Sequence, residues 1–340
     1  MNRITRRHIS VVLSLLLLLV IWLLYGWNSW NGDRDAYEFR YESNTLIVWG
    51  QEVGYGYLNT TGKKLGLTYQ EFQIFVATIT LFLIWRYIAA QGKSPFLLLL
   101  MYVICFFSLD YVLMRNSLAF AIILQALLFL FRGDFKGRII YGVLILLATS
   151  IHQSSIIYLP LILIPLTRVY SVWRFACFLV VFYLLFFVGR TFLYTLTVVT
   201  DHLDYYTASV TSGIVLCLVH LVSFLLVTMS VIKEKRDIFS IRAENTNDRR
   251  LIFIININLL SLVFFILYFE SGIFVRLLRT IIFINMCYCV NAIALARNAR
   301  FYATSHVIIF TVFLYVYFIQ PTLNLTVYPL FSKNLIFAMI

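Results

Sequence analysis

Long apolar runs separated by short charged segments cover most of the 340-residue chain. Runs of roughly 15 to 22 residues have the length that an α-helix needs to cross a bilayer. The pattern predicts eleven spans, near 9–27, 71–90, 95–114, 116–131, 138–151, 154–167, 173–189, 211–231, 251–268, 277–296 and 301–319. Polar residues at 28–70 predict an outer loop, and those at 232–250 predict a cytoplasmic loop. We expect an all-α polytopic membrane protein that forms a single integral membrane domain over residues 1–340.

Composition agrees with this class. The chain is 62% hydrophobic and 12% charged, whereas soluble domains carry about 25% charged residues. The basic start MNRITRRH precedes an apolar run that is too long for a cleaved signal peptide, so we expect it to remain as the first helix. The five cysteines lie within apolar runs, at spacings that indicate neither disulfides nor a metal site.

Charge predicts the orientation. With the N-terminus in the cytoplasm, the inner segments hold most of the 27 Lys and Arg and a minority of the 15 Asp and Glu. The positive-inside rule therefore predicts the N-terminus inside, the C-terminus outside and a functional site on the outer side of the membrane. Basic residues spread over short inner loops indicate contact with anionic membrane lipids and exclude nucleic acid as a partner.

A polar stretch, TSIHQSS at residues 149–155, interrupts two apolar runs. A helix from Gly137 to His152 rises about 22 Å, which is less than the roughly 30 Å of the hydrocarbon core. His152 is therefore predicted to lie below the outer surface, where a second short helix turns back inward. Irregular backbone at this depth must be buried in protein or line a wet cavity. His220 and His306, by contrast, are predicted to be interhelical contacts.

Three arginines are predicted to lie at the same depth as His152. Arg115 begins one apolar helix, and Arg276 and Arg279 share one face of another. A single arginine near a helix end can reach out to the headgroups. Three of them with a histidine predict an anionic site, for which pyrophosphate is a natural occupant because arginine pairs with its oxygens.

Other candidates lie in the outer segments. Asp33, Asp35 and Glu52 are candidate general bases, although exposed carboxylates are often only solvated. Tyr37 and Tyr55 could stack on sugar rings or form the interfacial belt. Proximity in sequence alone makes Asp201, His202 and Asp204 a weak metal candidate, and we expect no metal. Nucleotide and phosphate-loop motifs are missing from the sequence, and no cofactor is expected.

Several motifs together resemble one family. They are GDRDAYEFRYE with EVGYGYLNTTGKKLGLTYQEFQIFVATITL, then RNSLAFAIILQA, ATSIHQSSIIYLP and FVRLLRTIIF. In this order they are similar to EpsG-like proteins, which belong with the Wzy-type polymerases of O-antigen, capsule and exopolysaccharide. The resemblance covers residues 30–165 well and 270–290 weakly, and Val53-Gly54 stands where the family often has proline.

The resemblance implies a glycosyltransferase with a GT-C-like helical fold. It would join undecaprenyl-pyrophosphate-linked repeat units at the periplasmic face of the bacterial inner membrane and release undecaprenyl pyrophosphate, in company with a separate chain-length regulator. Arg115, Arg276 and Arg279 would hold pyrophosphate. His152 would bind substrate or act as base, in competition with Asp33, Asp35 or Glu52. The alternatives are a lipid-linked oligosaccharide flippase, an O-antigen ligase and a membrane glycan acyltransferase.

Overall fold

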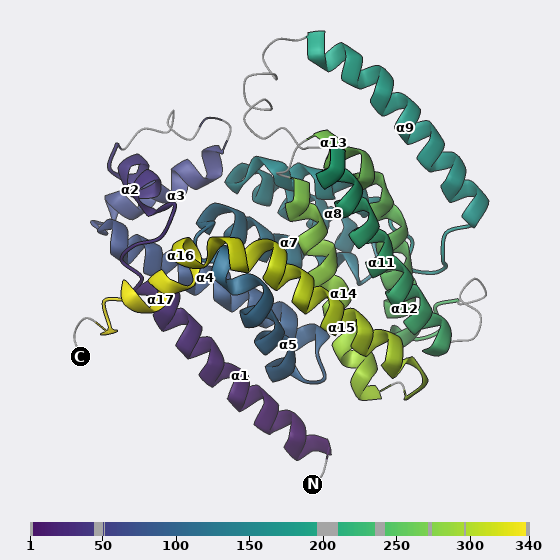
Figure 1. Ribbon diagram of the computed structural model, residues 1–340, viewed down its shortest axis with the longest axis horizontal. Coiled ribbons are helices and arrows are strands. Elements are labelled where there is room, and N and C mark those ends of the chain that lie inside the picture. Colours follow the sequence, from purple (N-terminus) through teal and green to yellow (C-terminus); the bar gives the residue numbers. More distant parts are fainter. Residues whose placement is uncertain are drawn as a thin grey trace. The chain divides into compact units, whose positions relative to one another are not determined.

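The structure is a computed structural model that describes residues 3–43, 50, 52–195, 210–234, 242–270, 274–295 and 297–337. The regular elements among these residues are helical (Figure 1). Six stretches are long and apolar enough to cross a membrane: His8–Gly26, Tyr69–Gln91, Thr211–Glu234, Asn247–Glu270, Val275–Ala294 and Arg297–Ser332. The prediction of an all-α integral membrane protein is confirmed. The count of eleven spans stays a prediction.

The chain divides into two compact units. Unit 1 comprises Met1–Ile162 with Ile308–Ile340, and unit 2 comprises Leu163–Val307. Unit 1 contains α1 (Arg3–Gly26), α2 (Arg34–Ser43), α3 (Val53–Lys64), α4 (Tyr69–Gln91), α5 (Pro95–Tyr102), η2 (Val103–Phe107), α6 (Ser108–Asp110), α7 (Met114–Leu130), α8 (Phe135–Ile151), most of η3 (Gln153–Leu163), η8 (Tyr315–Ile319), η9 (Gln320–Thr322), α16 (Leu323–Thr326) and α17 (Tyr328–Ser332). Unit 2 contains α9 (Val172–Thr195), α11 (Val210–Glu234), α12 (Thr246–Ser261), η5 (Leu262–Ile266), α13 (Leu267–Glu270), α14 (Val275–Leu295) and η7 (Arg297–Ala299). Helix α15 (Arg300–Leu314) crosses from unit 2 into unit 1.

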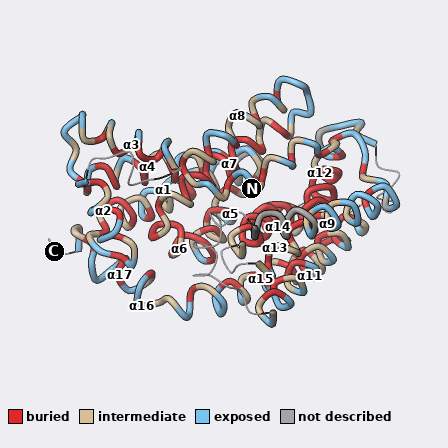
Figure 2. Tube along the Cα trace, turned by 90° about the horizontal axis from the view of Figure 1, so that it is seen from above, coloured by how far each residue is buried: buried red, intermediate tan, exposed pale blue. Residues whose placement is uncertain are grey.

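The long helices α1 and α4 of unit 1 pack antiparallel. Trp22 donates from Nε1 to Thr78 Oγ1 at 2.8 Å. Ser14, two turns earlier in α1, instead accepts from Trp85, two turns later in α4. Helix α7 is buried along most of its length (Figure 2) and packs against both α4 and α8. The end of unit 1 at which α1 finishes and α4 begins is called the Gly26 end below.

Local sequence signals set the ends of these helices. Thr68 and Glu71 form a capping box at the start of α4. Asp134 caps α8, because its carboxylate accepts the Gly137 N–H at 2.7 Å. Gly133, with φ of 77°, supplies the left-handed residue that separates α7 from α8. Helix α8 consequently begins at the end of unit 1 opposite the Gly26 end and runs toward it.

The predicted helical hairpin around His152 is confirmed. Helix α8 stops at His152, whose backbone is extended, and the chain returns as η3, a 3₁₀ helix with Pro160 inside it. The Tyr141 hydroxyl donates to the Tyr158 carbonyl, which fixes the two arms side by side. Pro160 disfavours an α-helix in this arm because its ring would clash with the carbonyl four residues earlier.

The polar segment 28–70 contains two helices, α2 and α3, where the sequence predicted a loop. Neither is apolar enough to be recognised by hydropathy, and helices this short are marginal without packing. The packing comes from aromatic residues: Tyr41 of α2 lies 4.9 Å from Phe72 of α4 between ring centroids and donates to the Leu67 carbonyl. Both helices lie at the Gly26 end.

The last helices of unit 1 pack on the end of α1 (Figure 1). The Ser29 N–H and hydroxyl both donate to the Lys333 carbonyl at 2.7 Å. The Leu335 N–H donates to the Trp27 carbonyl at 2.9 Å. Residues 27–29 and 333–335 therefore form a clasp, as we call this pairing, at the Gly26 end.

Buried polar side chains link four helices of unit 2. Asn258 of α12 and Asn285 of α14 exchange amide hydrogen bonds at 2.7 and 2.8 Å. Asn285 also donates to Ser223 of α11, which contacts His306 of α15 at 2.9 Å. The network continues through Ser261, His220 and Tyr268. The predicted interhelical role of His220 and His306 is confirmed.

Candidate active site

Glu52 is the centre of a polar cluster at the Gly26 end of unit 1. It occupies the position before the first residue of α3, but its side chain does not cap that helix. The carboxylate instead turns toward α7 and α8, and only 12% of the side chain is exposed. A carboxylate that leaves its own helix N-terminus uncapped forgoes a stabilising interaction, so its partners elsewhere must compensate.

His152 is the first partner of Glu52. Its Nδ1 lies 2.7 Å from Glu52 Oε1, and the next backbone N–H, that of Gln153, donates to the same oxygen at 3.3 Å. The extended backbone at the end of α8 places both groups on one side of the turn. A carboxylate beside Nδ1 favours the tautomer that has its proton there, which leaves Nε2 as the basic nitrogen.

Arg115 is the second partner. Its Nη1 forms an ion pair with Glu52 Oε2, so the two carboxylate oxygens contact a histidine and an arginine respectively. The position of the guanidinium is also set by Tyr37 of α2. Arg115 Nε donates to the Tyr37 hydroxyl at 3.2 Å, and the guanidinium lies 5.3 Å from the centre of the Tyr37 ring.

Gly54 allows α3 to approach α8 at this point. A Cβ atom at Gly54 would stand 2.2 Å from Ser150 Oγ and 3.0 Å from the Ser150 backbone carbon. Side chains do not reach such distances without displacement of one backbone. Gly54 therefore lets the start of α3 come close enough for Glu52 to reach His152.

The two tyrosines predicted to bind glycan are buried. Tyr55 has no exposed surface, and Tyr37 is 7% exposed. Their rings meet edge to face at 6.2 Å, and Tyr55 also packs against Phe72. Little of either ring is open to a sugar in this arrangement, and the glycan-binding role of both tyrosines stays a prediction. Tyr37 positions Arg115, and Tyr55 supports Tyr37.

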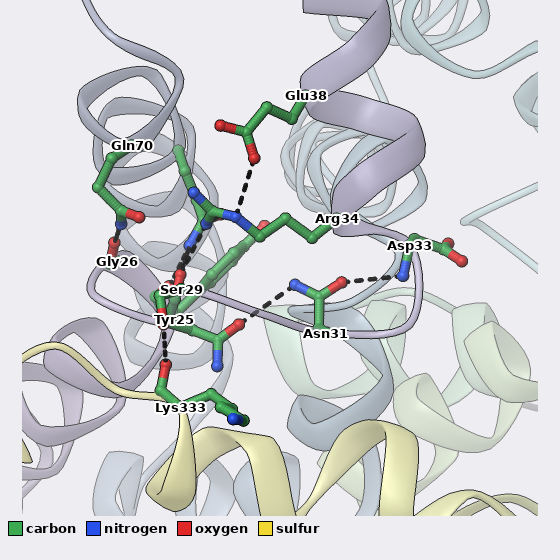
Figure 3. Close-up of polar contacts among 11 residues, drawn as sticks. Tyr25, Gly26, Ser29, Asn31, Asp33, Arg34, Glu38, Gln70 and Lys333 are labelled. Atoms are coloured by element: carbon green, nitrogen blue, oxygen red, sulfur yellow. Dashed lines mark hydrogen bonds and ion pairs between the residues drawn. The ribbon is translucent and has the colours of Figure 1, made fainter. Parts of the chain in front are cut away.

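The candidate acids Asp33 and Asp35 lie at the start of α2. The Asp33 N–H donates to Asn31 Oδ1 at 3.1 Å, and its carboxylate points away from Arg34 (Figure 3). Asp35 is exposed in the first turn of α2. Of the candidate bases, Glu52 and His152 are therefore the pair that the structure brings into direct contact.

Arg34, which lies between these two acids in the sequence, is buried. Its Nη1 donates to the Asn28 carbonyl at 2.9 Å and to Gln73 Oε1 at 3.0 Å, and its Nε pairs with Glu38 at 3.3 Å (Figure 3). Gln73 in turn donates to the carbonyls of Tyr25 and Asn28. Arg34 thus holds the turn between α1 and α2. An arginine flanked by aspartates in a polar segment gives no sequence signal of burial.

Arg276 and Arg279 both lie on α14, in unit 2, and Arg279 is 6% exposed. Arg115, His152 and Glu52 belong to unit 1. The convergence of Arg276 and Arg279 with Arg115 stays a prediction. The weak metal candidate Asp201, His202 and Asp204 lies outside the described residues.

These features define an integral membrane protein of helical type with a carboxylate, an imidazole and a guanidinium in contact at one end of unit 1. The chain belongs to the EpsG family, which it matches over residues 11–332. A comparison with curated proteins and a comparison with solved structures each gave no match. Membership of the EpsG family indicates a role in polysaccharide biosynthesis.

Proposed function

We propose that the protein is a polymerase that joins undecaprenyl-pyrophosphate-linked oligosaccharide repeat units and releases undecaprenyl pyrophosphate. The observation that carries this proposal is the contact of Glu52 with both His152 and Arg115. Glycosyl transfer from a pyrophosphate donor needs a base for the attacking hydroxyl and a cation for the leaving group. The cluster contains both.

In the proposed step, a sugar hydroxyl of the acceptor attacks the anomeric carbon of the donor chain. A new carbon–oxygen bond forms as the bond from that carbon to the pyrophosphate oxygen breaks. The pyrophosphate leaves with the bonding electrons, and the hydroxyl proton passes to the protein. No nucleotide is consumed, because the donor is already activated.

His152 is the proposed base, through Nε2. Glu52 accepts from Nδ1, which orients the ring and stabilises the imidazolium that forms, as the carboxylate of a catalytic triad does. Asp33 and Asp35 remain the competing bases. Base catalysis by a positioned side chain contributes about 10²- to 10⁴-fold.

Arg115 is the proposed pyrophosphate ligand of this unit. A guanidinium has five N–H donors, of which one contacts Glu52 and one contacts Tyr37. A guanidinium binds phosphate oxygens through paired N–H donors, the geometry that arginine favours. Arg276 and Arg279 are proposed as further pyrophosphate ligands on the strength of the sequence, in which they share one face of α14.

The cluster is proposed to face the periplasm, within a membrane domain of eleven spans. Charge within unit 1 supports this orientation through the positive-inside rule. The end opposite the Gly26 end carries Arg86, Lys93, Arg132, Lys136 and Arg138 with the acid Asp134. At the Gly26 end, the basic residues Arg34, Arg40, Lys63, Lys64 and Arg115 are matched by the acids Asp33, Asp35, Glu38, Glu42 and Glu52.

The test uses the purified full chain in liposomes with an undecaprenyl-pyrophosphate-linked repeat unit from its own host as the sole substrate. We expect a ladder of lengthening glycans on a gel. His152→Ala, Glu52→Gln and Arg115→Ala should each lower the rate about 100-fold or more. The matched controls are Glu42→Gln and Lys64→Ala, which change charges of the same sign at exposed positions of α2 and α3.

Translocation of the intact lipid without any ladder would overturn the polymerase proposal and favour a flippase. A ladder that persists at full rate in His152→Ala and Glu52→Gln would instead remove this cluster from the chemistry. In that case Asp33→Asn and Asp35→Asn would be the next variants.

A further inference from the structure

A second site of different character lies within unit 2. A cavity of about 860 Å³ is lined by apolar, aromatic and basic residues from the segment between η3 and α9, from α9 itself and from α12. This volume is near the upper end of the roughly 300–1,000 Å³ of ligand pockets, and it far exceeds what a small inorganic ion requires. The cavity belongs wholly to unit 2 and is independent of the proposed function.

The irregular segment that forms one wall is ordered by a buried amide. Asn256 of α12 has no exposed surface. Its Nδ2 donates to the carbonyls of Pro165 and Arg168 at 2.8 and 2.9 Å. Its Oδ1 accepts the Tyr170 N–H at 2.9 Å. One side chain thus makes three hydrogen bonds to the segment that forms this wall. The wall of the cavity is therefore fixed by specific contacts within the fold.

The mouth of the cavity is basic. Arg168 and Arg174 both line it and are exposed, and neither forms an ion pair with a described residue. Trp173, which is 82% exposed, stands beside them. Tryptophan and arginine at one level are typical of the boundary between lipid headgroups and acyl chains.

Apart from Ser171 and Tyr170, the remaining residues that line the cavity are apolar. Phe175 and Phe178 of α9 are in tilted contact with ring centroids 6.0 Å apart, and Leu163 and Leu260 contribute from the facing elements. Positive charge at the mouth and an apolar interior match an amphiphile that has an anionic head and hydrocarbon tails. Basic pockets between transmembrane helices bind anionic phospholipid headgroups in this way.

We propose that this cavity binds an anionic phospholipid, with its phosphate on Arg168 and Arg174 and its acyl chains along Phe175, Phe178 and Leu260. Free phosphate would use only the mouth of the cavity, and a neutral lipid would use only its interior. The charge of the mouth and the apolar interior together favour the phospholipid.

The test measures retained lipid by native mass spectrometry of the full chain, purified in detergent and supplied with phosphatidylglycerol. We expect Arg168→Ala/Arg174→Ala to bind roughly tenfold to thirtyfold less phosphatidylglycerol than the parent protein. Arg168→Lys/Arg174→Lys should recover part of the binding, because the charge is kept. The matched control is Arg297→Ala/Arg300→Ala, which removes two exposed arginines of unit 2 that do not line the cavity.

Two further arms identify the ligand. Inorganic phosphate should not displace phosphatidylglycerol, and diacylglycerol, which lacks the phosphate, should bind weakly. Leu163→Ser, at an exposed position of the apolar wall, should also lower binding. The proposal is overturned if the cavity and control variants bind lipid equally, or if inorganic phosphate displaces the lipid.

Discussion

Gly54 is the residue that most directly controls the distance between Glu52 and His152. Any side chain there meets Ser150 on α8, and both His152 and Glu52 lie within two residues of this contact. A methyl group added at Gly54 should therefore disturb the geometry of the candidate active site without contacting Glu52, His152 or Arg115 directly.

We predict that Gly54→Ala destabilises the protein by about 1–3 kcal/mol, the usual range for overpacking, and lowers polymer yield. The measurement is the midpoint of thermal unfolding in detergent together with the glycan ladder. Gly142→Ala on α8 is the control, because an added Cβ there makes only an ordinary contact at 3.6 Å. A second change, Ser150→Gly, should restore part of the loss. Full stability of Gly54→Ala would contradict the close approach.

At the scale of single residues, the sequence predicted positions better than partners. Helix rise alone placed His152 and Arg115 at a common depth, and both contact the same carboxylate. It could not show that Glu52, rather than Asp33 or Asp35, is that carboxylate, because the contact joins residues 100 apart. The sequence also did not reveal which tyrosines are buried. Tyr37 and Tyr55 are buried, although their position in a polar segment predicted that they are exposed.

Among the elements, a network of buried polar side chains links the helices of unit 2. Asn258 and Asn285, both fully buried, exchange two hydrogen bonds across α12 and α14. Removal of one partner leaves the buried amide oxygen of the other without this donor, whereas removal of both leaves neither oxygen there to be satisfied.

We predict that Asn258→Leu and Asn285→Leu each lower the free energy of unfolding by about 1–3 kcal/mol. The double variant should be less destabilised than the sum of the two single variants. Thermal unfolding of all four proteins completes the double-mutant cycle. Additive losses would show that the two amides act independently.

Hydropathy recovered the long helices because about 20 apolar residues in a row have few alternatives to a membrane span. It missed α2 and α3, whose stability comes from buried tyrosines and from Arg34 rather than from an apolar face. It also assigned the returning arm of the hairpin to an ordinary short helix. Pro160, visible in the sequence, was the available signal for a 3₁₀ arm.

For the whole molecule, the clasp bears on which side of the membrane each end of the chain occupies. It places residues 333–335 at the end of α1 opposite its first residues. If α1 crosses the bilayer, those two parts of the chain must face different compartments.

We predict that a reporter fused before residue 3 is cytoplasmic and that one fused after residue 337 is periplasmic. Alkaline phosphatase, active only outside the cytoplasm, and a fluorescent protein, active only inside it, give opposite readouts. A fusion after Lys93 is the control and should match the N-terminus, since Ser94 lies beside Ser10 at the start of α1. Termini on the same side would exclude the eleven-span topology.

The clasp also joins two parts of the chain that the ribosome synthesises at very different times. Ser29 and Lys333 are 304 positions apart, and at about 5–20 residues per second a ribosome needs roughly 15 to 60 s to cover that distance. The first helix must therefore wait in the membrane, with its exit turn lacking these bonds, while the rest of the protein is inserted. Assembly of the Gly26 end is thus among the last events of biogenesis, and any truncation that removes residues 333–335 leaves that turn without its clasp.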